Sequence, residues 1–406
     1  MFILVIFRFG CAVIVPFADA TAIGQAVQGN NFFGFLNAFS GGAFGKGTVF
    51  ALSIQPYITA SIIVQLLAIA IPALERLQKE GETGRKKINR ITKYVTLGMS
   101  LLQAYGYYMM LKKSGGIATA YQTGFAKYFV LTVIVLTFTA GASIVVWMGD
   151  QITEKGIGNG ISMILFAGIL AGLSTQGDIL VQAFKAGGKN IILVPFIILV
   201  FVAMIVFIII MTEAERRIPV QYAKRMVGRK MYGGQSSFIP IKVSMSGVMP
   251  IIFAMSIVGI PSTIAAYAPP KTEFWIKVVN ALSTTGWVYA ILYLLLIIAF
   301  NYFYVAIQYN PIEIANNIKS NNGAIPGIRP GKPTSTFISK VIGKITFVGA
   351  IFLGVIAVFP IVFNGLTDIN VAMGGTSIII IVGVALETMR QLESQLMMRH
   401  HKGFLE

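Results

Sequence analysis

The chain is poor in the residues that most often carry chemistry. Among 406 residues there is one cysteine, Cys11, and the two histidines, His400 and His401, lie side by side near the end of the sequence. A single cysteine excludes a disulfide framework and a CxxC metal pair, and it argues against redox chemistry. Because both histidines lie outside the apolar runs, the ligand set of a zinc protease that works inside a membrane is missing.

Acidic side chains are scarce as well, with 15 against 32 lysines and arginines. None of them lies in the middle of a long apolar run. Transporters coupled to protons or sodium ions usually carry the ion on a carboxylate or histidine inside the membrane, and a membrane enzyme needs a nucleophile with a base beside it. We therefore predict that the protein is not an enzyme. A secondary transporter of inverted-repeat type and a membrane enzyme acting on lipid or peptide are the rival functions.

Nucleotide-binding motifs are incomplete. The Gly-Lys pair at 45–46 is followed by Gly47 and the pair at 331–332 by Pro333, where a phosphate loop has the Ser or Thr that binds magnesium. The stretch GIGNG at 156–160 opens an apolar run instead of following a strand, unlike a dinucleotide fingerprint. We predict no cofactor and no metal, so that another component must supply the energy for any transport.

Apolar residues, in contrast, are abundant. Hydrophobic residues make up 56% of the chain, charged residues 12%, and the mean hydropathy is +0.77. A bilayer core of roughly 30 Å needs about 20 apolar residues per helix, which leaves room for about ten spans and their loops. No run alternates with the period of two that a membrane barrel requires. We predict an all-α integral membrane protein with spans near 2–18, 48–72, 94–111, 128–148, 157–174, 191–211, 243–266, 287–307, 341–363 and 373–392.

Basic residues are divided unequally between the two sets of loops. With an even number of spans both termini lie on one face, and the loops of that face carry 23 of the 32 lysines and arginines, against eight on the other face and Arg8 within the first run. The positive-inside rule makes the richer face cytoplasmic. No basic segment precedes the first run, so we expect a retained span and not a cleaved signal. The long basic loops 213–242 and 308–340 suit a docking partner, with anionic lipid as the alternative.

Segment 28–47 is apolar but too short to cross a bilayer, and it breaks at Gly41 and Gly42. We predict a re-entrant helix, with an external hairpin cap as the alternative. Pro56 and Pro250 lie inside the predicted second and seventh spans. Prolines at matching places fit two five-span halves related by inverted repetition.

Six longer motifs are spread over the chain: FSGGAFGKGTVFALSIQPYITASIIVQLL at 39–67, KEGETGRKKI at 79–88, GIGNGIS at 156–162, VQYAKR at 220–225, GAIPGIRPGKPT at 323–334 and GGTSIIIIVGVALE at 374–387. Together they resemble the SecY family of translocase channels, and the resemblance runs from residue 1 to 406. The sequence departs from the family in two places. It begins within the first span, without the short basic amphipathic helix that usually precedes it, and VPFADA replaces a VPGVD-like stretch.

This resemblance implies a fold of about ten helices in two pseudo-symmetric five-helix halves around a central pore. The halves would be 1–174, with spans 1–5 and a plug at about 32–44, and 175–406, with spans 6–10 and docking loops 213–242 and 308–340. The implied function is a protein-conducting channel for secretion across, and lateral insertion into, the bacterial plasma (inner) membrane, with both termini cytoplasmic. The conduit would be passive and driven by the SecA motor ATPase or the ribosome.

The resemblance also implies partners and a constriction. The partners are SecE-like and SecG-like small membrane subunits, SecA, the ribosome through contacts to its RNA, signal sequences, nascent chains and membrane lipids. The family's pore ring maps onto Ile54, Ile58, Ile161, Leu165, Ile252 and Ile380. An apolar ring closes around a peptide without holding it, and when empty it dewets against ions. Judged on the residues alone, ordinary core packing is the favoured explanation of such a set.

Three further sites follow from the same resemblance. The plug would include Phe32, Phe39, Ser40, Gly41, Gly42 and Phe44. The lateral gate, between spans 2 and 3 on one side and 7 and 8 on the other, would include Thr59, Gln65, Asn159, Ser256 and Ile260. Ordinary interhelical hydrogen bonding is the alternative role of Gln65. The docking surface for motor or ribosome would include Lys224, Arg225, Arg229, Lys230 and Arg329.

Overall fold

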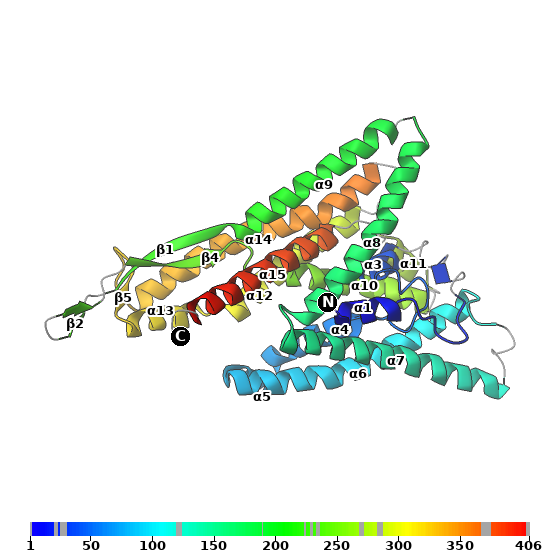
Figure 1. Cartoon of the computed structure of the whole chain (residues 1–406), viewed down its shortest axis with the longest axis horizontal. Helices are drawn as coiled ribbons and strands as arrows, with labels where there is room; N and C mark the ends of the chain where they lie inside the picture. The colour runs from blue at the N-terminus through cyan, green and yellow to red at the C-terminus, as the bar shows by residue number, and fades with distance from the viewer. Residues whose placement is uncertain are drawn as a thin grey trace.

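The computed structural model describes residues 2–19, 23–24, 31–118, 124–188, 190–222, 225–227, 230–232, 236–267, 272–281, 287–366 and 375–402. Long helices dominate it (Figure 1): α6 (Glu82–Lys113), α7 (Gly124–Lys155), α8 (Gly160–Lys185), α9 (Asn190–Glu213), α10 (Met249–Tyr267), α12 (Trp287–Gln308), α14 (Lys332–Leu366) and α15 (Gly375–Lys402). Shorter helices are α1 (Phe2–Gly10), α3 (Asn31–Phe39), α4 (Gln55–Ala70), α5 (Pro72–Lys79), α11 (Glu273–Ala281) and α13 (Pro311–Ser320).

Six of these helical stretches are long and apolar enough to cross a membrane, counted over the described residues. They contain α7, α8, α9, α12, α14 and α15, and α4 with α5 forms a bent seventh candidate. Backbone groups in hydrocarbon must find partners within the chain, and a helix satisfies them locally. The prediction of a helical membrane protein is confirmed, whereas the number of ten spans stays a prediction.

The first two predicted spans contain less helix than expected. Helix α1 ends at Gly10, and after a turn residues 13–15 lie beside 47–49, where Val15 N donates to the carbonyl of Gly47 over 3.0 Å and Val49 N to that of Val13 over 2.9 Å. Regular helix in the second span begins only after Ile54, and the residues before it form turns in which Ser53 has a φ of 46°. The predicted boundaries 2–18 and 48–72 were therefore wrong at these ends.

Proline sets where α4 and α10 begin. Pro56 lies in the first turn of α4, and Pro250 is the second residue of α10. A first-turn proline breaks no helical hydrogen bond, because the N–H it lacks has no partner there. The prediction that both prolines lie inside a span is corrected: each starts a helix. At the other end of α4, Pro72 begins α5, and the two helix axes meet at 106°.

The two basic loops contain strands, which the sequence reading did not predict. β1 (Glu215–Tyr222) pairs antiparallel with β4 (Ser236–Lys242) and with β5 (Gly323–Ala324), in the order β4-β1-β5. β2 (Arg225–Val227) and β3 (Lys230–Tyr232) form a second, two-stranded ribbon. Alternating burial along β1, with Ile218 and Val220 inward, packs the sheet on α13 and the start of α14. Figure 1 places these elements, α5 and the C-terminus at one end of the molecule.

Apolar side chains form four clusters among the described residues. One is built only from residues 15–142 and another only from residues 208–382, so each predicted half has its own core. The predicted boundary at 174/175 lies within α8, and the division into two halves stays a prediction. A third cluster draws on both halves and is called the central cluster: Phe7, Cys11, Phe39, Ala43, Phe50, Ile54, Ile58, Ile62, Val145, Met148, Ile164, Leu165, Ile169, Ile252, Phe253, Ile380 and Val384.

Candidate functional site

The six residues predicted to form a pore ring come together. Five of them belong to the central cluster, and Ile161 packs against it. Ile54 has no exposed surface, and Ile380 keeps 2%. They come from four helices: the start of α4, the start of α8, the start of α10 and α15. An uncharged, aliphatic contact between the two halves is what a closed constriction needs, although its role as a pore stays a prediction.

Helix starts explain why these side chains meet. Ile54 is the N-cap of α4 and Ile58 follows one turn later, so both lie on one face. Ile161 and Leu165 have the same spacing in α8, whose N-cap Asn159 accepts from the backbone of Ile161 over 3.0 Å. The residue pattern shows the spacing within each helix, but only the fold shows that the faces converge.

The predicted plug forms a short helix followed by a tight turn. Asn37 and Ser40 hold the turn together: Asn37 Oδ1 accepts from Gly45 N over 2.7 Å, while Ser40 Oγ donates to the Asn37 carbonyl over 3.0 Å and accepts from Phe44 N over 2.9 Å. Gly41 and Gly42 follow with φ of 65° and 85°. This conformation favours glycine, which confirms the predicted break after α3. The side chain of the sixth predicted residue, Phe32, lies outside the described set.

The plug segment, residues 32–44, packs against the central cluster and against α8. Phe39 belongs to that cluster and Phe44 to the core of the first half. A Cβ added to Gly168 of α8 would lie 2.5 Å from the carbonyl oxygen of Phe39, so the two backbones touch. The hydroxyl of Tyr107 in α6 donates to the carbonyl of Phe44. The close approach of α8 is possible because Gly168 has no side chain, and on the other side the buried Tyr107 bonds to Phe44. The plug segment is thus held on both sides.

Arg8 is a contact of the plug segment that sequence reasoning missed. Its Nη1 donates to the carbonyl of Gly41 over 2.7 Å. The thiol of Cys11, one turn further, lies 3.8 Å from the carbonyl of Ser40. Arg8 is the one charged residue of the first apolar run. A charged side chain within a membrane span is costly, so its presence there indicates a functional role. That signal was available in the sequence.

The predicted gate residues find partners close to themselves. Thr59 Oγ1 donates to the Gln55 carbonyl over 3.0 Å, and Gln65 Nε2 to Ser61 Oγ over 3.3 Å. Ser256 Oγ similarly bonds one turn back in α10, Asn159 caps α8, and Ile260 is exposed. Within the described residues α6 contacts α10, which brings the two predicted sides of the gate together. Polar bonding across this seam stays a prediction.

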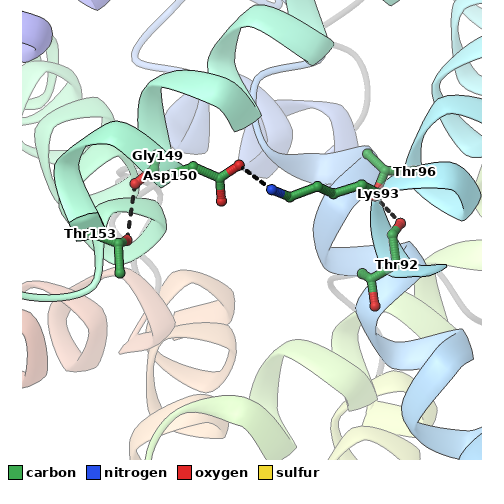
Figure 2. Close-up of polar contacts among 6 residues, drawn as sticks. All are labelled: Thr92, Lys93, Thr96, Gly149, Asp150 and Thr153. Carbon is green, nitrogen blue, oxygen red and sulfur yellow. Dashed lines mark hydrogen bonds and ion pairs between the residues drawn. The ribbon is translucent and has the colours of Figure 1, made fainter. Parts of the chain in front are cut away.

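An ion pair joins α6 to α7 near the predicted gate (Figure 2). Lys93 Nζ lies 2.6 Å from Asp150 Oδ2, and both side chains are partly exposed. Thr92 and Thr153 flank the pair and bond to their own helices. Partly exposed ion pairs contribute only about 0–1 kcal/mol to the free energy of folding. This contact therefore joins α6 to α7 but adds little to stability. This pairing was not predicted, because the two residues belong to different predicted loops.

Four of the five predicted docking residues lie outside the described residues, either entirely or with their side chains. Lys224 and Arg229 lie outside the described residues, and Arg225 and Lys230 are in β2 and β3 with side chains outside them. Arg329 is exposed in the turn after β5, and its carbonyl accepts from Thr334 Oγ1 over 2.9 Å.

The three-stranded sheet also carries exposed cations that were not predicted, Arg216, Arg217 and Lys242. Arg217 of β1 pairs with Glu215 over 2.7 Å and lies 4.8 Å from the centre of the Phe238 ring.

No metal site is found within the described part of the chain, where no three His, Cys, Asp or Glu residues lie close enough together to hold an ion. A buried polar centre lies in the second half. Asn301 of α12 bonds to Ser246 Oγ and donates to the carbonyl of Thr346 over 2.8 Å. These bonds tie the segment before α10 to α12 and α14, so their role is structural.

Comparisons with known proteins agree with the motifs. The family model described as SecY matches residues 48–389. The chain is 41% identical over 424 residues to the protein translocase subunit SecY of Mycobacterium tuberculosis (strain ATCC 25618 / H37Rv), covering 100% of this chain and 95% of that protein. It is 43% identical over 421 residues to that of Streptomyces galbus, covering 99% and 94%.

Solved structures with low sequence identity share the fold. One described as "The structure of a protein conducting channel" has a TM-score of 0.66 at 19% identity and covers 97% of this chain and 90% of its own. Another, "Sec61 in the Canine ribosome-channel complex from the endoplasmic reticulum", has a TM-score of 0.61 at 17% identity with the same coverage. Together with the family match and the close relatives, these similarities show that the chain belongs to the SecY family.

Proposed function

We propose that this chain is the channel-forming subunit of a protein translocase, which lets polypeptides cross the bacterial plasma membrane or enter it sideways. The observation that carries the proposal is the central cluster: six aliphatic residues, predicted as a ring, meet where the two halves of the molecule touch. The relatives are named protein translocase subunits, which supports the same function.

An apolar constriction suits this task for a physical reason. A ring of charged side chains would bind a passing polypeptide and attract ions, whereas branched aliphatic side chains offer no fixed partner to either. Packed together they exclude water, and the plug segment covers them with Phe39. Opening then requires only that the two halves separate slightly, because no charge pair between ring residues has to break.

The cargo supplies the selectivity for lateral exit. Each central Leu or Ile of a segment favours the bilayer by roughly 0.5 kcal/mol, and a charged residue opposes it by about 2.5 kcal/mol or more. Helices α4 and α6 on one side and α10 and α12 on the other would form the gate. Since Thr59, Gln65 and Ser256 bond locally, little polar bonding would have to break when these helices part.

The driving force comes from outside the chain. We place the end that holds α5, the three-stranded sheet, α13 and the C-terminus in the cytoplasm, because it carries most of the basic residues. There Arg329 and the ribbon of β2 and β3 would contact the SecA motor or ribosomal RNA, since a guanidinium binds carboxylate and phosphate alike. SecE-like and SecG-like subunits would complete the complex in the membrane.

Reconstitution tests this function directly. The chain would be co-expressed with a SecE-like single-span protein, purified as a complex and placed in vesicles with SecA, ATP and a precursor protein. We expect protease-protected precursor inside the vesicles only when the complex, SecA and ATP are all present. Failure of the chain to co-purify with any such subunit, together with substrate uptake driven by an ion gradient, would favour the rival transporter.

A further inference from the structure

A small cavity lies where the plug segment, the turn before α4, α6 and α8 meet. Its volume is about 90 Å³. Apolar groups form most of its wall, but polar side chains of the plug segment, the turn before α4, the start of α4 and α6 also line it. The residues that matter here are Phe39, Phe44, Ser53, Gln103, Tyr107 and Leu165.

Two buried polar atoms in this wall have no hydrogen-bond partner among the described residues: Ser53 Oγ and Gln103 Oε1. Ser53 keeps only 5% of its surface exposed. Buried polar atoms in native proteins are nearly always paired, with protein or with ordered water, so each exception calls for an explanation. Two exceptions lining one cavity point to a shared occupant.

Two other polar groups of the wall, the hydroxyls of Ser40 and Tyr107, are already engaged. Ser40 Oγ bonds to Asn37 and Phe44, and the hydroxyl proton of Tyr107 goes to the carbonyl of Phe44. The backbone at Ser53 is also committed, with its N–H donating to the carbonyl of Phe50 over 2.9 Å. Neither hydroxyl can therefore donate to Ser53 or Gln103 without breaking a bond that it already makes.

Ser53 is held in an unfavourable backbone conformation at this place. Its φ is 46°, in the left-handed region that residues with a Cβ rarely adopt. The next residue, Ile54, is the N-cap of α4 and a predicted ring residue. Strain of this kind persists only where surrounding contacts fix it, and a bonded Ser53 hydroxyl would be one such contact.

We propose that this cavity is a water-binding site, in which ordered water accepts from the Ser53 hydroxyl and donates to Gln103 Oε1. One water needs roughly 10–15 Å³ of such space and two to four polar partners, and the cavity offers more than that volume. The hydroxyl oxygen of Tyr107 supplies a further acceptor. An apolar occupant such as a lipid tail would fill the space but leave both atoms unpaired. The water site would thereby fix the turn that connects the plug segment to α4.

The sign of a stability change tests the proposal. Ser53→Ala removes the hydroxyl, and Gln103→Met replaces the whole side-chain amide, both Oε1 and Nε2, by apolar groups of similar volume. Thermal unfolding would be measured on the complex with its SecE-like subunit in lipid nanodiscs. If water satisfies these atoms, each variant loses hydrogen bonds and its midpoint falls by about 1–2 °C. If the cavity is dry, removing an unpaired atom raises the midpoint, which would overturn the proposal.

Thr48→Val is the matched control for the thermal measurement. Its hydroxyl is buried in the same turn but already donates to the carbonyl of Ala43 over 3.3 Å, so its removal should lower the midpoint in either case. A high-resolution structure of the parent complex decides the question even if a variant fails to fold. Density for water between Ser53 and Gln103 supports the site, whereas an empty or lipid-filled cavity contradicts it.

Discussion

Arg8 and Gly41 are joined by a hydrogen bond of 2.7 Å between the guanidinium and the backbone carbonyl, across 33 residues of sequence. The bond ties the first helix to the turn of the plug segment. Hydrogen bonds from charged donors contribute roughly 1.5–3 kcal/mol. Because the carbonyl belongs to a glycine with positive φ, the bond also fixes the turn that lets the plug segment fold back. The plug position thus depends on a residue outside the plug.

Arg8→Ala should loosen the plug segment. Losing about 1.5–3 kcal/mol from the closed position raises the population of displaced plug roughly 10-fold or more. The measurement is ion leak through the complex in planar bilayers without cargo, which should increase. Arg8→Lys, which keeps the charge but not the planar fork, should give an intermediate leak. An unchanged leak in Arg8→Ala would show that the plug segment is held by its other contacts alone.

Gly168→Ala should displace the same segment from the α8 side. The added methyl would lie 2.5 Å from the carbonyl oxygen of Phe39, which forces the backbones apart at a cost of about 1–3 kcal/mol. Gly98→Ala is the control, because a Cβ there meets no atom within 4 Å. Limited proteolysis of the plug segment should be faster in the first variant only. Equal rates in both variants would mean that α8 does not determine the plug position.

Ile380→Asn should weaken the seal of the predicted ring. Ile380 is buried in the central cluster, and loss of its apolar contacts destabilises the closed state by about 1.5–3 kcal/mol. Export of precursors with defective signal sequences should therefore improve. Its neighbour Ile379 is just as buried but belongs to the core of the second half, so Ile379→Asn should lower stability without this gain. If both variants behave alike, the ring assignment fails.

Arg329→Glu should impair docking of the motor more than folding. Arg329 is exposed, and reversing its charge beside an acidic or phosphate partner costs roughly 10-fold in affinity or more. Motor-driven secretion in vesicles is the readout, with Lys155→Glu as a charge-matched control, because Lys155 is exposed at the end of α7 and lies outside the predicted docking loops. Secretion should fall more strongly in Arg329→Glu than in the control. An equal loss in both would point to general electrostatics instead of a specific contact.

Much of the architecture follows from the sequence because it depends on local signals. Apolar length predicts helices, and Gly41 with Gly42 predicts the break after α3. The paired prolines mark corresponding helices, although they begin α4 and α10 instead of lying inside them. Local signals did not predict which segments far apart in the sequence pair with each other. Nothing near 13–15 predicts that this stretch lies beside 47–49, and the strands of the basic loops were missed for the same reason.

The sequence predicted which residues belong to the candidate site, but not which other residues they contact. The six ring residues could be named because their motifs resemble a known family, and the fold then brought them into one cluster. The contacts of the plug segment could not be predicted from the sequence. Gly168 and Tyr107 contact backbone carbonyl groups of distant residues, and every residue has a carbonyl group, so nothing in the sequence marks these contacts. Arg8 is the exception, since a lone charge in an apolar run stands out.

Photo-crosslinking to a polypeptide arrested in transit tests the central claim most directly. A photoreactive residue would replace Ile54 or Ile252 of the ring and, as equally buried controls, Ile134 or Ile297 of the two separate cores. The account predicts crosslinks to the arrested chain from both ring positions and none from the controls. Ring positions that crosslink no more than the controls would contradict it.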